Sequence, residues 1–163
     1  MKPVHETPTR PLDYAALSAT YGTLLGTVVL AAREHGVEPV QGRDLPALGL
    51  AAFALSKLIA KEKVETWVRE PFLDEASRRP KGKGMRYAVG ELLGCTRCLG
   101  AWSSLGLVAL RVTRPREARV VTAVLATSAL NDFLQTAFTL LCARTNTTEK
   151  IEQLKERELA TTT

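Results

Sequence analysis

The chain has too few cysteines and histidines for a disulfide framework or a complete metal cage. Its 163 residues include 3 cysteines, Cys95, Cys98 and Cys142, whereas a small secreted domain is held together by several cysteine pairs. The 2 histidines lie far from these cysteines in sequence. Neither a Ser-His-Asp grouping nor a dinucleotide-binding fingerprint is present. The sequence therefore favours a protein that is not an enzyme, although it leaves that question open.

Aromatic residues are also scarce, at 6% of the chain, which disfavours a stacking platform for single-stranded nucleic acid. The net charge of +5 suits an anionic partner. The basic loop Arg78 to Arg86 is not accompanied by a nucleic-acid-binding motif, so we expect anionic lipid headgroups and no nucleic acid as partners. The mean hydropathy of -0.02 is low for a multi-pass membrane protein. A soluble helical interaction domain therefore stays an alternative.

Four apolar segments nevertheless organise the chain. The first has no charged residue and approaches the about 20 residues that a membrane span requires. The third is short, so we expect it either to cross or to re-enter the bilayer. The pattern predicts an all-α fold, a small multi-pass transmembrane helical bundle with three to four membrane helices and short loops. The four segments are Tyr14 to Ala32, Leu45 to Ala60, Cys98 to Leu110 and Val120 to Ala143.

Composition divides the chain into three parts. We predict a disordered N-terminal arm over residues 1–13, a helical membrane domain over 14–143, and a polar tail over 144–163 that can form a short amphipathic helix. Lys and Arg are concentrated between residues 61 and 97, and cytoplasmic loops carry an excess of these residues. We therefore expect the protein in the cell membrane, with its N-terminus and tail in the cytoplasm.

Several polar residues interrupt the apolar segments. Asn131, Asp132 and Gln135 lie midway along the last segment, and an acidic group inside a membrane usually faces a partner or a water-filled path. Lys57, in the second segment, or Arg97 can neutralise Asp132, and Lys57 can also extend its amine to the surface. We expect a structural contact between helices in preference to an ion path.

Two aromatic residues lie in the polar stretch that follows the second apolar segment. Trp67 and Phe72 are suited to anchor this stretch at the surface of a bilayer, facing lipid. The alternative is a solvated loop that contains one buried tryptophan.

The Cys-x-x-Cys pair lies where a polar loop becomes an apolar segment. If Cys95 and Cys98 share a helix, they share a face. If Cys95 instead caps the helix, the helix dipole and Arg97 lower its pKa and make it the more reactive thiol. Thiol–disulfide exchange, a zinc site completed by Glu91 and a second subunit of a homo-oligomer, and simple packing near Trp102 all fit the pair. No cofactor is required, and a catalytic role for the two cysteines stays open.

The motif Cys-x-x-Cys-x-Gly-x-Trp, within Gly90 to Trp102, is the most specific of several matching pieces. Through it, the chain resembles a bacterial family of small multi-pass membrane proteins of unknown function, one of whose members is named for sporulation. The resemblance runs from Asp44 to about Phe138, and Thr96 stands where the family usually has proline. The resemblance implies a membrane location and no activity. We therefore expect an integral protein of the bacterial inner membrane with a structural or accessory role. The other matching pieces are Leu48 to Val64, Val68 to Phe72 and Ala129 to Leu134.

Overall fold

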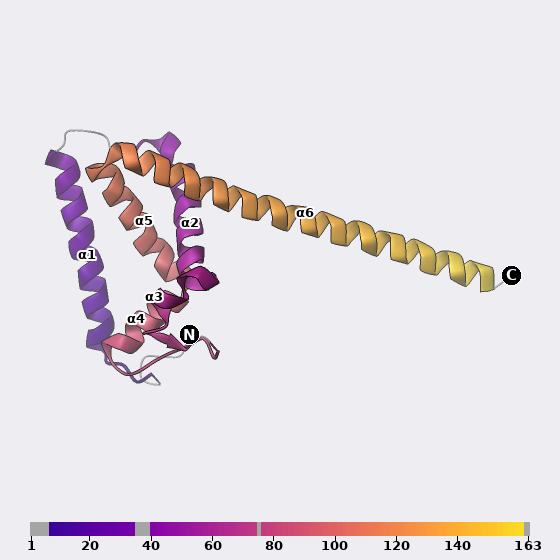
Figure 1. Cartoon of the computed structure of the whole chain (residues 1–163), viewed down its shortest axis with the longest axis horizontal. Coiled ribbons are helices and arrows are strands. Elements are labelled where there is room, and N and C mark those ends of the chain that lie inside the picture. The colour runs from indigo at the N-terminus through magenta and orange to yellow at the C-terminus, as the bar shows by residue number, and fades with distance from the viewer. Residues whose placement is uncertain (1–6, 35–39, 75, 162–163) are drawn as a thin grey trace. The chain divides into compact units, whose positions relative to one another are not determined.

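The computed structural model describes residues 7–34, 40–74 and 76–161, without the side chains of 148, 149 and 151–161. The chain forms two compact units, Met1–Ser128 and Ala129–Thr163, and each is described by itself. The predicted all-α class is confirmed, with one hairpin of two-residue strands added (Figure 1). The elements are α1 (Pro11–Glu34), η2 (Gly42–Asp44), α2 (Leu45–Lys61), η3 (Lys63–Glu65), α3 (Thr66–Arg69), β1 (Leu73–Asp74), β2 (Arg79–Pro80), α4 (Met85–Gly94), α5 (Thr96–Thr113) and α6 (Pro115–Thr161).

Helices α2 and α5 pack against each other and form the core of the first unit. The α2 side of this contact consists largely of small residues, among them Ala51, Ala52 and Ala60, which are buried. Small side chains allow two helix backbones to approach closely. On α5, Leu107 joins the same cluster as Ala51 and Ala52, and Ala126 of α6 completes it. The two helices are thereby fixed as one block on which the other elements rest.

An ion pair closes one end of this block. Arg111 Nη2, near the end of α5, lies 3.3 Å from Asp44 Oδ2, immediately before α2. The same carboxylate oxygen accepts a hydrogen bond from Gln41 N at 3.2 Å. Pro46 occupies the first turn of α2, where its missing N–H costs nothing. Because the end of α5 meets the start of α2, the two helices are antiparallel.

Two arginines cap the other end of α2. The side chain of Arg69 is only 1% exposed, and its Nη1 donates to Ile59 O at 2.6 Å and to Glu62 O at 3.0 Å. Arg78 Nη1 donates to Ala60 O at 3.2 Å. The last four carbonyls of a helix have no partner inside the helix. The basic segment after α2 therefore folds back onto the helix end and supplies the missing donors.

The hairpin connects this cap to α4. Strands β1 and β2 are antiparallel, and Leu73 is paired with Pro80. Arg86, in the first turn of α4, donates to Pro71 O through both Nε (2.9 Å) and Nη2 (2.6 Å). A Cβ atom at Gly90 would lie 2.6 Å from Phe72 O, which is closer than a side chain can approach. Glycine at this position thus allows α4 to pack directly on the hairpin.

Helix α1 begins at Pro11, three residues before the predicted start at Tyr14. None of its residues is buried, and it is long and apolar enough to cross a membrane. Within the described part of the chain, the only other candidate is the pair α4 and α5, which passes the same test together but is bent by 90°. Length and composition thus support one crossing, or two if the bent pair is a single broken span.

The second unit consists of the distal part of α6. Its backbone is helical as far as Thr161, so the polar tail continues α6. Asn131 and Gln135 are exposed on this stretch, and Asp132 is half-buried. Thr136 and Thr139 donate their hydroxyls to Asp132 O (2.8 Å) and Gln135 O (2.9 Å), so these hydroxyls are satisfied within the helix.

We predict that Arg69→Ala lowers the free energy of unfolding by about 2 to 4 kcal/mol, because carbonyls at the end of α2 lose charged donors in a buried site. Thermal unfolding of the purified protein measures the loss. Arg79→Ala is the matched control, because Arg79 lies in β2, close to Arg69 in sequence, with an exposed side chain, and it should change stability by no more than about 0.5 kcal/mol. Equal losses in the two variants would contradict the capping role of Arg69.

Candidate functional site

Cys95 occupies the turn between α4 and α5. Its backbone is extended, with φ −105° and ψ 103°, so α4 ends at Gly94 and the chain changes direction by 90°. The Cys95 Sγ atom accepts a hydrogen bond from Cys98 N at 3.3 Å. Of the two arrangements considered from the sequence, the structure has the one in which Cys95 caps α5.

The environment of Cys95 favours its thiolate. Partial burial acts to raise the pKa of the Cys95 thiol, but hydrogen bonds from the Cys98 side chain and from the N–H groups of Cys98 and Arg97 act against it. The positive charge of Arg97 adds to these bonds, and the pKa of Cys95 lies below its usual value. A thiol at the N-terminus of a helix is a typical reactive cysteine for this reason.

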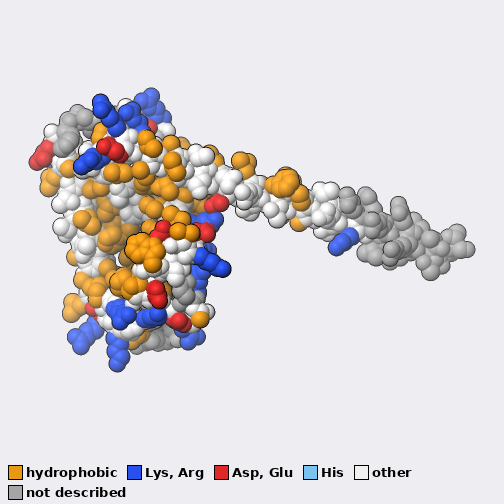
Figure 2. All heavy atoms as spheres, viewed as in Figure 1, with side chains coloured by type: hydrophobic (Ala, Val, Ile, Leu, Met, Phe, Trp, Pro, Cys, Tyr) orange, Lys and Arg blue, Asp and Glu red, His pale blue; other side chains and the backbone are white. Residues whose placement is uncertain are grey.

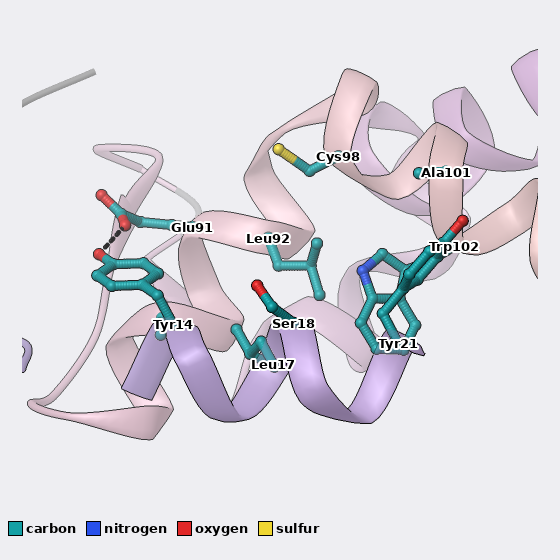
Figure 3. A pocket seen from close by; sticks show the side chains of 10 residues that line it. Tyr14, Leu17, Ser18, Tyr21, Glu91, Leu92, Cys98, Ala101 and Trp102 are labelled. Carbon is teal, nitrogen blue, oxygen red and sulfur yellow. Dashed lines mark hydrogen bonds between the residues drawn. The ribbon is translucent and has the colours of Figure 1, made fainter. Parts of the chain in front are cut away.

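Beside this turn, α1, α4 and α5 line an open cavity of about 540 Å³ (Figure 3). Its wall is mostly apolar and contains one of the two motif cysteines, Cys98. Cys95 is not part of the wall, so the two thiols of the pair lie in different surroundings. The lining residues are Tyr14, Leu17, Ser18, Tyr21, Ala88, Glu91, Leu92, Cys98, Ala101 and Trp102.

A polar pair and an aromatic pair hold α1 against α4 and α5. The Tyr14 hydroxyl of α1 donates to Glu91 Oε2 of α4 (Figure 3). Two turns further along α1, the ring of Tyr21 packs edge to face against the ring of Trp102. The ring centroids are 5.3 Å apart and the ring planes lie at 71°. Such edge-to-face pairs are the favoured geometry of aromatic contacts. These two contacts mark the polar and the aromatic parts of the cavity wall.

The predicted zinc ligands do not assemble into a metal site within one chain. Glu91 and Cys98 both line the cavity, but Glu91 accepts the hydrogen bond from Tyr14. Among the residues that the structure describes, no three His, Cys, Asp or Glu side chains gather closely enough to hold a metal ion. A zinc site would need ligands beyond the described residues, so zinc stays a prediction.

The structure places the other predicted site residues on separate elements. Lys57 Nζ lies 3.8 Å from Glu62 Oε1. Trp67 is 72% exposed on α3, whereas Phe72 is half-buried before β1. The polar group at Asn131, Asp132 and Gln135 lies on α6 in the second unit, and its predicted role is neither supported nor contradicted.

The α1 side of the cavity was not predicted from the sequence. Tyr14, Ser18 and Tyr21 recur at intervals of four and three residues, which places them on one face of a helix. That stripe of hydroxyl groups in an otherwise apolar segment was the available signal. It did not reveal the partner, because Glu91 is 77 residues from Tyr14 in sequence.

These features define a small helical protein in which a Cys-x-x-Cys turn joins two helices at a sharp bend and an apolar N-terminal helix lies over that turn. The chain belongs to the bacterial family described as "Protein of unknown function (DUF1360)", whose model matches residues 47–138. The match contains most of α2 and all of α4, α5 and the Cys-x-x-Cys turn. Helix α1, which supplies four of the cavity residues, lies outside it.

One similar protein is the sporulation protein YjcA of Bacillus subtilis (strain 168). It is 27% identical over 108 residues, which cover 60% of this chain and 92% of that protein. No solved structure matches the chain. The comparisons thus agree with the resemblance found in the sequence and add no biochemical activity.

We predict that Cys95 reacts with a maleimide faster than Cys98 at neutral pH. Alkylation proceeds through the thiolate, so a lowered pKa shifts the rate profile of Cys95 toward lower pH. The measurement compares Cys98→Ser with Cys95→Ser over a range of pH, both in a Cys142→Ser background. A variant that retains only the exposed Cys142 provides the reference thiol. Equal and slow alkylation rates for Cys95 and Cys98 would contradict this prediction and indicate that the two cysteines only pack in the structure.

Proposed function

We propose that the protein is an integral membrane protein of the bacterial cell membrane, with a structural or accessory role and with α1, α2, α5 and part of α6 as its membrane helices. The observation that carries the proposal is the exposure of α1. A helix that is apolar around its whole circumference must be covered, either by a protein core or by lipid. In the first unit no residue of α1 is buried, and Leu30, for example, is 59% exposed.

The polar residues of α1 are compatible with lipid. Thr20, Thr23 and Thr27 donate their hydroxyls to backbone carbonyls of the same helix at distances of 2.7 to 2.8 Å. These groups therefore present no unpaired donor to a bilayer. The 24 residues of α1 span about 36 Å, which exceeds the about 30 Å of a hydrocarbon core. Its contacts through Tyr14 and Tyr21 favour a retained helix over a removable signal sequence.

The distribution of charge in the first unit also supports this proposal. In Figure 2, hydrophobic side chains cover much of the middle of the unit, and Lys and Arg side chains gather at its two ends and along one side. Helices α2 and α5 have 17 and 18 residues, or about 26 and 27 Å, so they are slightly shorter than a typical bilayer core. Modest thinning of the bilayer, or extension of flanking Lys and Arg side chains to its surface, accommodates such a mismatch.

A fourth crossing is assigned to the segment Val120 to Ala143 of α6. Large apolar side chains remain exposed along it, including Leu134 at 69% and Phe138 at 68%. This segment includes the polar group around Asp132, for which a membrane interior demands a partner. The even number of crossings returns the tail to the side of the N-terminus.

The hydrogen bonds of the first unit support a cytoplasmic location for the basic end. Gly84 N donates to Pro8 O at 2.9 Å, which joins the N-terminal arm to the basic segment before α4. At the opposite end, Arg111 is paired with Asp44 and Arg114 lies 3.9 Å from Glu117. These pairs neutralise two arginines at the end that we assign to the outside. The positive-inside rule counts Lys and Arg and not net charge, so it still disfavours these arginines there. The exposed Trp67 is suited to the cytoplasmic membrane surface.

Thiol–disulfide exchange is a second candidate function. This candidate is supported by the position of Cys95 at the N-cap of α5, where Cys98 N donates a hydrogen bond to Cys95 Sγ. A cytoplasmic pair is normally kept reduced, so such activity would be transient. The rates of alkylation described above distinguish this candidate from a purely structural role.

We predict that the protein stays in the pellet when bacterial membranes are washed with alkaline carbonate. Lipid-embedded helices resist this treatment, whereas surface-bound proteins are released. A variant lacking residues 7–34 tests the contribution of α1 and should be less completely retained. Release of the full chain, or its purification as a monomer without detergent, would contradict the proposed membrane insertion.

We predict that single cysteines at Ser77 and Thr161 resist an impermeant maleimide in intact cells, because both positions face the cytoplasm. The background carries serine at the three native cysteine positions. Gly42→Cys is the matched positive control at the opposite end, where an added side chain meets nothing within 4 Å. All three positions should react once the membrane is permeabilised. Labelling of Ser77→Cys in intact cells would refute the orientation, and labelling of Thr161→Cys alone would remove the crossing assigned to α6.

A further inference from the structure

The cavity between α1, α4 and α5 contains a carboxylate, that of Glu91, which has no ion-pair partner among the described residues. Glu91 is half-buried, and its Oε2 accepts a hydrogen bond from Tyr14. Within residues 7–34, 40–74 and 76–161, no Lys, Arg or His forms an ion pair with Glu91. Glu91 is the one charged side chain among the described residues of the cavity wall. A ligand that brings a positive charge would complement it.

The rest of the wall suits an apolar chain. Leu17 and Leu92 lie between the polar pair and the aromatic pair, and Trp102 bounds the far side (Figure 3). The volume of about 540 Å³ falls within the range of about 300 to 1,000 Å³ that is typical of small-molecule sites. The cavity therefore has an anionic group at one end and an apolar, aromatic region at the other.

We propose that this cavity binds a cationic amphiphile, with its ammonium group at Glu91 and its hydrocarbon chain along Leu17 and Leu92 toward Trp102. Charge complementarity disfavours fatty acids and other anionic amphiphiles, because their headgroup would meet the Glu91 carboxylate. The ligand is either a membrane lipid with an amine headgroup or a free lipophilic amine. The inference goes beyond the proposed membrane role and depends on it only for the lipid source.

The experiment uses the intrinsic fluorescence of Trp102. The chain has 2 tryptophans, and Trp67 is not part of the cavity wall, so Trp67→Phe leaves Trp102 as the sole indole reporter. The protein is reconstituted in phosphatidylcholine vesicles and titrated with a terminally brominated dodecylamine, whose bromine quenches indole on contact. We expect saturable quenching, and about tenfold weaker binding of the brominated dodecanol, which lacks the charge.

Two alanine variants test the location. Ala101→Phe fills the cavity and should abolish saturable quenching, whereas Ala19→Phe adds the same ring at an exposed position of α1 outside the wall and should preserve it. Glu91→Gln should remove the preference for the amine over the alcohol. Equal quenching in the two alanine variants, or an amine preference that survives in Glu91→Gln, would overturn the proposal.

A competition experiment distinguishes a membrane lipid from a free amine as the ligand. Phosphatidylethanolamine added to the vesicles should displace the brominated amine if the ligand is a membrane lipid, and lack of displacement assigns the site to a free amine. The carbonate wash tests membrane insertion independently. Saturable amine binding by a protein that carbonate releases would therefore refute the membrane role and leave the cavity assignment intact.

Discussion

The close contact between α2 and α5 is the constraint on which the rest of the first unit depends. Alanines at the centre of α2, including Ala51 with no exposed surface, bring the two backbones together, so both helix axes are fixed. The pair Arg111–Asp44 closes one end of this block. At the other end the chain must leave α2 and return to begin α5. The cap, hairpin and α4 occupy that return path and determine where the Cys-x-x-Cys turn lies.

The basic residues of that path have a structural task before any interaction with lipid. Arg69, Arg78, Lys81 and Arg86 each donate to a backbone carbonyl of the cap or the hairpin. A carbonyl left without a donor at a helix end costs about as much as a lost hydrogen bond. Positive charge at this end thus serves two requirements at once, because the same side chains that satisfy carbonyls also give the end the charge expected of a cytoplasmic surface.

Apolar runs were sufficient to predict the four long helices α1, α2, α5 and α6, because burial and membrane insertion both act on whole segments. They were insufficient for the return path. Strands of two residues leave no periodic pattern, and the bond between Tyr14 and Glu91 joins positions 77 residues apart. The grouping of Glu91 with Cys95 rested on their closeness in sequence. The extended backbone at Cys95 ends α4 at Gly94, so the two residues belong to different structural elements. The alternative role of Cys95 as a helix cap followed from the change of composition at that point and agrees with the geometry.

The Cys-x-x-Cys turn and the cavity have different structural origins. The turn is built entirely within the family-matched residues 47–138, from α4, α5 and the hairpin that packs on Gly90. The cavity also needs α1, which lies outside that match and contributes Tyr14 and Tyr21 to the wall. A protein that shares only the matched segment can therefore retain the capped thiol while lacking the cavity. Any property common to the family is thus expected to reside within residues 47–138, which contain the turn, whereas recognition of an amphiphile is expected only where a helix equivalent to α1 covers it.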